Sequence, residues 1–225
     1  MRINTLLDTK LIQNIKLFEA FNDDELKALT EHFIQRQYNK NVVIINERDE
    51  TNSLYIILKG RVKIYLNDES GKEIILDTQS AGDYFGEMSL LDDEPRSASV
   101  MTLEDSQFAI LNKSDFLHAL RDKPELALSI IRGLSLRLRS GNDNVRCLAL
   151  MDVYGRVVHM LMELSKEQAD GTRIIEEPLT YEDLANRVGA SSKMISRIMN
   201  DLKKGSYLRK EAKKIIIERR LPAAW

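Results

Sequence analysis

The sequence predicts an α+β protein with an N-terminal antiparallel β-roll, a long dimerisation helix and a C-terminal winged helix-turn-helix. Three observations carry this prediction. Short β-branched runs separated by Gly, Asn and Asp fill residues 37–111, a proline-free apolar heptad pattern follows, and two short amphipathic segments flank Gly189 near a basic end. We expect the β-roll at residues 1–122, the long helix and hinge at 123–151, and the winged helix-turn-helix at 152–225.

Length and composition indicate a globular protein with a substantial core. The chain has 225 residues, of which 43% are hydrophobic and 30% are charged. No apolar run reaches the roughly 18 residues that a membrane span needs. The N-terminal residues lack the basic region, apolar core and cleavage site of a secretory signal. We therefore expect a soluble, cytoplasmic protein with no membrane partner.

Two residue types argue against metal and redox chemistry. Cys147 is the one cysteine, so the chain cannot form an internal disulfide or the thiolate cluster of an iron-sulfur or structural zinc site. His32, His118 and His159 are scattered without the spacing of a ligand pair. We expect no metal, no haem, no iron-sulfur cluster and no catalytic residues, and hence no enzyme.

The charge is unevenly distributed along the chain. The overall net charge is −2, yet Arg187 to Arg220 holds eleven Lys and Arg against three acids, a net of +8, which leaves −10 for the rest. Such polarity indicates a polyanion-binding C-terminal end. A solvated surface with an accidental bias is the alternative.

The N-terminal half predicts one helix and then a sheet. Residues 22–33 offer an Asn cap and acids in the first turn, which favours a helix. The runs VVIIN, SLYIILKG, RVKIYL, EIILDT and QFAIL predict strands. Gly60 and Gly71 stand where hairpin turns are expected, because glycine tolerates positive φ. We expect the strands to pair antiparallel.

A long helix is expected from Lys123-Pro124 to about Leu150, since proline suits the first turn and none follows. Its apolar residues alternate in steps of four and three, flanked by Arg132, Arg137 and Arg139; the seam is Ala127, Ile131, Leu134, Leu138, Gly141, Val145 and Leu148. That spacing predicts a two-fold coiled coil and a homodimer. Packing of the stripe on its own sandwich is the alternative.

The chain then predicts a hinge or cap at Asp152, a helix over YGRVVHMLMELSKEQ, and short strands at TRII and just before Leu179. Thr180 caps a helix that ends at Gly189. A second helix is expected to point Met194, Ile195, Ile198, Met199 and Leu202 inward and Ser192, Lys193, Ser196, Arg197 and Asn200 outward. This is the spacing of a helix-turn-helix.

The outward side chains suit base edges and phosphates of duplex DNA. The predicted DNA-binding residues are Ser191, Ser192, Lys193, Ser196, Arg197, Lys203 and Lys213, with Arg197 as the candidate for a guanine contact. Lys204, Arg209, Lys210 and Lys214 extend the basic character into a predicted hairpin wing. A helical pair used for protein contact is the alternative.

The stretch YFGEMSLLDDEPRSASV, Tyr84 to Val100, combines groups that a sugar phosphate requires. Gly86 permits close backbone approach, Glu87 offers an acceptor to ribose hydroxyls, and Arg96 with Ser97 offers a cation and a hydroxyl to phosphate. A helical turn through SLLDDE would present N-terminal amides to the anion. An internal Glu87–Arg96 salt bridge that ties down the loop is the alternative.

FGEMSLLDDEPRSASV closely resembles the phosphate-binding cassette of cyclic-nucleotide-binding domains. The order of roll, long helix and helix-turn-helix resembles bacterial transcription regulators of the cyclic-AMP receptor protein/Fnr family over essentially the full chain. LALMDVYGRVVHMLMEL and LTYEDLANRVGASSKMISRIMNDL look like its hinge and DNA-binding helices. The resemblance implies a cyclic nucleotide effector, a pseudo-palindromic DNA site and RNA polymerase as a partner. The implied ligand-binding set is Gly86, Glu87, Met88, Arg96, Ser97, Ala98, Gly141 and Asn142.

Two departures bear on specificity. Gly141 and Asn142 stand where the cyclic-AMP receptor has a Thr-Ser pair that meets adenine, so cyclic AMP is favoured as effector while cyclic di-GMP, another nucleotide or ligand-independent DNA binding remain alternatives. In the reading helix, the receptor's Arg-Glu-x-x-x-Arg pattern becomes residues 192–197, ending in the retained Arg197. A cyclic-nucleotide-sensing subunit that gates a protein partner is a further alternative, which would not need the basic end.

Overall fold

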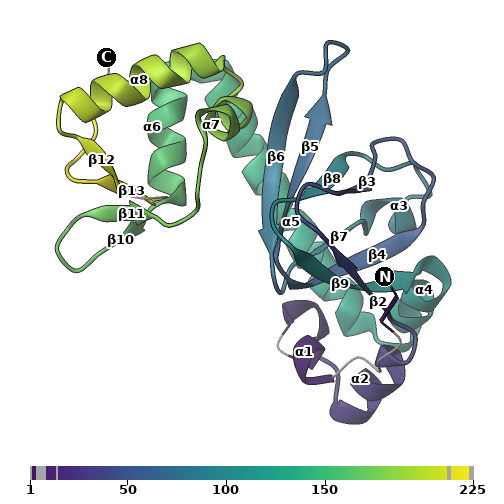
Figure 1. The fold of residues 1–225 in the computed structure, drawn as a ribbon. Coiled ribbons are helices and arrows are strands. Elements are labelled where there is room, and N and C mark those ends of the chain that lie inside the picture. The colour runs from purple at the N-terminus through teal and green to yellow at the C-terminus, as the bar shows by residue number, and fades with distance from the viewer. Residues whose placement is uncertain (1, 4–8, 14, 212–213, 223–225) are drawn as a thin grey trace. The chain divides into compact units, whose positions relative to one another are not determined.

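The computed structural model describes residues 2–3, 9–13, 15–211 and 214–222. The chain forms two compact units, one of residues Met1–Leu66 with Ile75–Leu138 and the other of Asn67–Ile74 with Arg139–Trp225. Figure 1 labels the helices and strands of both units. The first unit contains the roll and the second contains the helix-turn-helix.

The roll consists of two antiparallel sheets. The five-stranded sheet has the order β1 (Arg2–Ile3), β2 (Ile34–Tyr38), β9 (Ser106–Asn112), β4 (Ser53–Lys59) and β7 (Tyr84–Phe85). The four-stranded sheet has the order β3 (Val43–Ile45), β8 (Ser99–Thr102), β5 (Arg61–Asn67) and β6 (Glu73–Ser80). The antiparallel prediction is confirmed, although β1, β2, β7 and β8 were not among the expected strands.

Strand β4 contributes side chains to two apolar cores, one on each face of its sheet. Tyr55 and Ile57 belong to the core inside the roll, where the Tyr55 ring stacks on Phe85 with centroids 5.0 Å apart. Leu54 and Ile56 point the other way and join the core beneath the helices. Successive side chains of a strand face opposite sides of the sheet, so one strand supplies both cores.

Short helices cover the outer face of the five-stranded sheet. They are α1 (Thr9–Gln13), the 3₁₀ helix η1 (Lys16–Phe18), α2 (Asp23–Thr30) and α4 (Lys113–Asp122), and α1, α2 and α4 lie together in Figure 1. The predicted Asn cap is confirmed, because the Asn22 side chain accepts a hydrogen bond from the Glu25 backbone amide. In return, the Asn22 backbone amide donates to the Glu25 carboxylate. The sequence pattern did not single out α4.

The predicted hairpin glycines have the expected conformation. Gly60 has φ +95° and Gly71 has φ +79°. A Cβ at Gly60 would lie 2.2 Å from Ser106 Oγ, so this turn also needs glycine for lack of space.

The long helix α5 spans Pro124–Leu150, as predicted. Only Leu126 and Ile130 are buried along it. Seam residues lie exposed instead, with Leu138 at 67% and Val145 at 65% of full exposure. The protomer therefore leaves most of the heptad seam uncovered.

The second unit builds a small sheet against three helices. The sheet has the order β10 (Lys166–Glu167), β11 (Arg173–Ile175), β13 (Lys214–Ile217) and β12 (Leu208–Glu211), and the helices are α6 (Val153–Leu164), α7 (Tyr181–Val188) and α8 (Ser192–Lys204). Asp152 caps α6 by accepting from the Gly155 amide at 2.7 Å, which confirms the predicted cap.

Several element boundaries differ from the predictions, and α2 ends at Thr30 rather than at Phe33. Helix α6 ends at Leu164 rather than at Gln168, because residues 166 and 167 pair with β11. The residues just before Leu179 form no strand; β10 is the partner of β11 instead. The turn α3 covers only Met88–Leu91, because Asp93 has φ +62° and Glu94 precedes a proline, which disfavours helix.

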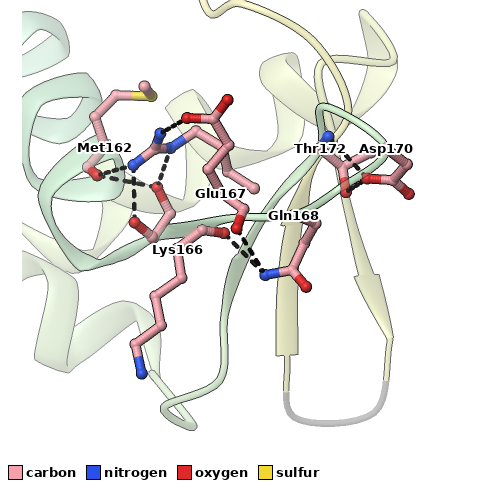
Figure 2. A network of polar contacts seen from close by, with 8 residues as sticks. Met162, Lys166, Glu167, Gln168, Asp170 and Thr172 are labelled. Carbon is pink, nitrogen blue, oxygen red and sulfur yellow. Dashed lines mark hydrogen bonds and ion pairs between the residues drawn. The ribbon is translucent and has the colours of Figure 1, made fainter.

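Arg173 holds the turn between α6 and β11, and Figure 2 labels its partners Met162 and Glu167. Arg173 donates to Ser165 Oγ (2.8 Å), to the Ser165 carbonyl (2.8 Å) and to the Met162 carbonyl (3.3 Å), and pairs with Glu167 (3.3 Å). The last carbonyls of a helix lack intrahelical partners, so the guanidinium satisfies the C-terminal end of α6.

Candidate functional site

The first candidate site lies where β7 ends and the chain turns into α3. Gly86 follows β7 with φ +86°. A Cβ there would lie 2.6 Å from Arg96 Nη1 and 2.8 Å from the Ser53 carbonyl oxygen. Both the conformation and the space therefore require glycine, and the chain passes close to the Arg96 guanidinium.

Arg96 is 4% exposed and held by three donated hydrogen bonds. They run to the Thr51 hydroxyl (3.0 Å), the Gly86 carbonyl (2.7 Å) and the Ser53 carbonyl (2.8 Å). Burial lowers the pKa of Arg96, yet a guanidinium titrates so far above neutrality that it remains charged. A guanidinium has five N–H groups, so Nη1 and Nη2 each keep one more for an anion.

Glu87 is 2% exposed and pairs with a helix residue that the sequence did not indicate. Arg137 of α5 donates to Glu87 Oε1 and to the Tyr84 carbonyl, each at 2.5 Å. The alternative of a Glu87–Arg96 salt bridge is wrong. Arg96 donates to a hydroxyl and two carbonyl oxygens, and Glu87 forms its ion pair with Arg137. Fifty residues separate this pair, and the sequence pattern indicates Arg137 only as a charge flanking the heptad seam.

A buried amide completes the surroundings of Arg137. The neighbours of Gln79 favour the orientation of its side-chain amide in which the nitrogen and oxygen exchange places. In that orientation the nitrogen donates to the Tyr84 carbonyl and the oxygen accepts from Arg137 Nη2, both at 3.0 Å. The Arg137 guanidinium also lies over the Tyr84 ring, 4.8 Å from its centroid. Sequence patterns gave no signal for either Gln79 or Tyr84 as part of this cluster.

The remaining cassette residues lie at the same place. Ser97 is exposed, and its hydroxyl lies 3.7 Å from the Met88 sulfur, while Ala98 is buried at the start of the return toward β8. The structure thus brings together Gly86, Glu87, Met88, Arg96, Ser97 and Ala98. Gly141 and Asn142 are exposed residues of α5 that belong to the second unit, and their role toward a ligand stays a prediction.

The second candidate site is the helix pair α7 and α8. Thr180 caps α7 through a capping box with Asp183, and Gly189 ends the helix with φ +66°, as the sequence predicted. Ser191 then caps α8 by accepting from the Met194 amide at 3.3 Å. Local side-chain caps therefore set where both helices begin.

Helix α8 presents a polar face. Ile195, Ile198, Met199 and Leu202 are buried as predicted, whereas Met194 is 42% exposed, so its predicted inward position is wrong. Met194 lies in the first turn of α8, which begins at Ser192. The predicted DNA-binding residues Ser191, Ser192, Lys193 and Arg197 are exposed, and Ser196 is half-buried.

The basic residues beyond α8 differ in their surroundings. Lys203 donates to the Tyr181 hydroxyl at 3.1 Å. Arg209 pairs with Glu211 and Glu218, which offsets part of the positive charge of the wing. Lys213 lies outside the described residues.

Within the described residues, no three His, Cys, Asp or Glu side chains gather as a metal ion would require. Each histidine lies beside one acid, His32 with Asp115 (3.3 Å), His118 with Asp122 (3.2 Å) and His159 with Glu163 (4.0 Å). In this part of the chain no helix has the length and hydropathy of a membrane span.

Two family models match the chain, one in each half. The family model "Cyclic nucleotide-binding domain" matches residues 35–123, and "Crp-like helix-turn-helix domain" matches residues 155–221. The chain is 28% identical over 211 residues to the CRP-like cAMP-activated global transcriptional regulator of Mycobacterium tuberculosis, covering 92% of this chain and 94% of that protein.

Solved structures share the fold. The c-di-GMP responsive global regulator CLP of Xanthomonas campestris matches with a TM-score of 0.75 at 24% identity over 84% of this chain and 96% of that one. A CooA mutant from Carboxydothermus hydrogenoformans matches with a TM-score of 0.76 at 21% identity over 95% and 93%. With a cyclic nucleotide-binding domain followed by a Crp-like helix-turn-helix, the chain belongs to the Crp/Fnr family of DNA-binding transcription regulators.

Proposed function

We propose that this regulator is a homodimer whose binding to DNA is controlled by a cyclic nucleotide in the roll, with cyclic AMP as the favoured effector. The observation that carries the proposal is the position of Arg96. Its buried guanidinium lies against Gly86 and retains N–H groups that no described residue takes.

The cassette suits a cyclic nucleotide in each of its chemical parts. The cyclic phosphate would bind Arg96 and the Ser97 hydroxyl, since a guanidinium matches two phosphate oxygens. Ribose hydroxyls would donate to Glu87, a fixed carboxylate acceptor. Arg137 contacts Glu87 Oε1, so a ribose hydroxyl would donate to Oε2 of the same carboxylate.

Support for cyclic AMP comes from the relative in Mycobacterium tuberculosis, whose name describes it as cAMP-activated. Support for a different base comes from Gly141, since a Cβ there would meet no atom within 4 Å. If α5 meets the base, that open position admits a larger one, which makes cyclic di-GMP the second candidate.

The uncovered seam of α5 supports the homodimer. Ile131, Leu138 and Val145 are spaced by seven residues on the helix and are all exposed in the protomer. A second copy of α5 would cover them in a parallel two-fold coiled coil. Two-fold symmetry then places the α8 helices in half-sites about 34 to 36 Å apart on a pseudo-palindromic DNA site. From there the dimer would contact RNA polymerase.

Control by the nucleotide requires a difference in affinity between two arrangements of the dimer. A ligand shifts such an equilibrium only by as much as it binds one arrangement better. We infer that the nucleotide favours the arrangement in which both α8 helices meet the two half-sites.

Calorimetric titration with cyclic AMP tests the proposal. Arg96→Lys keeps the charge but loses the two-pronged guanidinium, and Arg121→Ala removes an exposed arginine of α4 as the matched control. The unsubstituted protein and Arg121→Ala should bind with micromolar affinity or better, and Arg96→Lys at least tenfold more weakly. If titration with cyclic di-GMP releases heat and titration with cyclic AMP does not, cyclic di-GMP is the effector. No heat from either, with intact folding by circular dichroism, would refute nucleotide control.

A further inference from the structure

The guanidinium of Arg36, on β2, has no acceptor among the described residues. Arg36 is half-buried, and its Nε is buried without a hydrogen-bond partner. The other buried or half-buried arginines described in the first unit are Arg61, Arg96 and Arg137, and each of them donates to a carboxylate, hydroxyl or carbonyl oxygen. A partly buried cation without a partner is destabilising, so Arg36 lacks a group that its three counterparts have.

Two tyrosines surround the same phenylalanine as Arg36. The register of β2 and β9 places Arg36 directly opposite Phe108. The rings of Tyr38 from β2 and Tyr55 from β4 both pack on Phe108, with centroids 5.8 Å and 6.3 Å away. Residues two apart on a strand lie on the same face of the sheet, so Arg36 and Tyr38 share a face. All three residues therefore meet around Phe108 in the core inside the roll.

The two phenol hydroxyls add donors to this place. Both tyrosines are half-buried, and neither hydroxyl donates a hydrogen bond to a described residue. Burial raises the pKa of Tyr55 and so does the neighbouring Tyr38, whereas Arg96 and Arg36 act in the opposite direction. The Tyr55 hydroxyl thus lies within electrostatic reach of two guanidinium groups. It keeps its proton at neutral pH, which leaves it a donor.

The carboxylate closest to this cluster is engaged elsewhere. Asp49 also raises the pKa of Tyr55. Its Oδ2 accepts from the Asn46 backbone amide at 3.0 Å and from the Asn46 side-chain amide at 3.2 Å. Asp49 forms no ion pair with Arg36. A guanidinium and two hydroxyls therefore face a place where the described chain supplies them no acceptor. A phosphate group has the charge and the several oxygens that such a donor set requires.

We propose that Arg36, Tyr38 and Tyr55 form a second anion site in the roll, which binds a phosphate-type oxyanion separately from the cassette. The guanidinium would bind two oxygens, and the two phenols would donate to the remaining ones. Arg96 adds positive charge from the side while its own hydrogen bonds hold it in the cassette. This inference goes beyond the proposed function and does not depend on it, because none of the three residues belongs to the cassette.

Calorimetric titration with inorganic phosphate, at an ionic strength fixed with sodium chloride, tests the site. The unsubstituted protein and Arg121→Gln, which changes an exposed arginine of α4, should bind phosphate with equal affinity. Arg36→Gln removes the cation and should bind at least tenfold more weakly, with circular dichroism checking that it folds. Equal phosphate affinity in Arg36→Gln and Arg121→Gln would overturn the site, as would the absence of phosphate binding in the unsubstituted protein.

A double variant tests the site without touching the arginine. Tyr38→Phe with Tyr55→Phe keeps both rings on Phe108 and therefore keeps the apolar core, so it guards against poor folding of Arg36→Gln. Loss of two hydrogen bonds to a charged ligand should weaken phosphate binding by about fivefold or more. A double variant that binds phosphate as tightly as the unsubstituted protein would remove both hydroxyls from the site and contradict the proposal.

Arg96→Lys distinguishes the second site from the cassette. This change keeps a positive charge near Tyr55 but loses the guanidinium of the cassette, so phosphate affinity should stay within about twofold. Phosphate should also still bind when cyclic AMP is present at saturation. Loss of phosphate binding in Arg96→Lys or on addition of cyclic AMP would place the phosphate in the cassette and overturn the second site. If the protein binds no cyclic nucleotide, the proposed function fails, while the phosphate titrations of the Arg36 and tyrosine variants still decide this inference.

Discussion

Arg137 Nη1 lies 2.5 Å from Glu87 Oε1, which pairs a helix residue with the buried carboxylate of the cassette. A carboxylate so fully buried depends on its partner, because an unpaired charge in the interior is strongly destabilising. The same contact places the long helix and the candidate ribose acceptor in one network.

Arg137→Ala should therefore lower the free energy of unfolding by about 2 to 3 kcal/mol, somewhat less than for a fully buried pair because the arginine is partly exposed. Replacing both partners, as Glu87→Gln with Arg137→Met, should be milder than the single change. Urea denaturation measures both, with Arg132→Ala, an exposed residue of the same helix, as the control. Equal stability of Arg137→Ala and Arg132→Ala would contradict the pairing.

Gly86→Ala should abolish nucleotide binding. The added Cβ would lie 2.6 Å from Arg96 Nη1 at a backbone φ of +86°, so the cassette must shift to accept it. Gly141→Ala is the matched control for stability, since it meets open space on a helix and should stabilise by about 1 kcal/mol. Calorimetry and thermal unfolding of the two variants check this. Normal nucleotide affinity in Gly86→Ala would rule out the cassette as the binding site.

Leu138→Glu should prevent formation of the proposed dimer. Leu138 lies on the heptad seam, where a charge would be buried against its two-fold mate. Leu136→Glu changes a residue of the same helix that is equally exposed, at 68%, but lies off the seam. Sedimentation velocity distinguishes them: the seam variant should sediment as a monomer and the control as a dimer. Two dimers, or two monomers, would be inconsistent with the predicted seam.

Arg197→Ala should lose discrimination at one base pair by about 1 to 3 kcal/mol, whereas Lys213→Ala should weaken binding to all sequences alike. Arg197 is exposed on α8, from which its guanidinium would reach a base edge if α8 enters the major groove. Selection of a binding site from random duplexes, followed by titration of single-base variants, measures both effects. Equal weakening of selected and random DNA by Arg197→Ala would remove its base-reading role.

The predictions that held rest on local chemistry. The Thr180 cap, the left-handed Gly189 and the cap at Asp152 each depend on residues within one turn, so the sequence alone defines them. Gly86 and Arg96 could be predicted as cassette residues because the backbone freedom of glycine and the charge of arginine are visible in the sequence itself. The fold class follows from these elements and from the periods of the apolar residues.

The features that were missed depend on distant partners. Arg137 meets Glu87 across fifty residues, and Gln79 meets both Tyr84 and Arg137 from another strand. Strands β7 and β10 have two residues each, too short for a periodic pattern, and form because β4 and β11 pair with them. Met194 has the apolar character of a core residue, yet its side chain is 42% exposed.

The most direct test of nucleotide control is the affinity for a selected DNA site, measured by fluorescence anisotropy with and without saturating cyclic AMP, for the unsubstituted protein and Arg96→Lys. The account predicts tighter binding with cyclic AMP by tenfold or more in the unsubstituted protein and no change in Arg96→Lys. Equal affinity with and without cyclic AMP or cyclic di-GMP, in a protein that binds its site selectively, would contradict it.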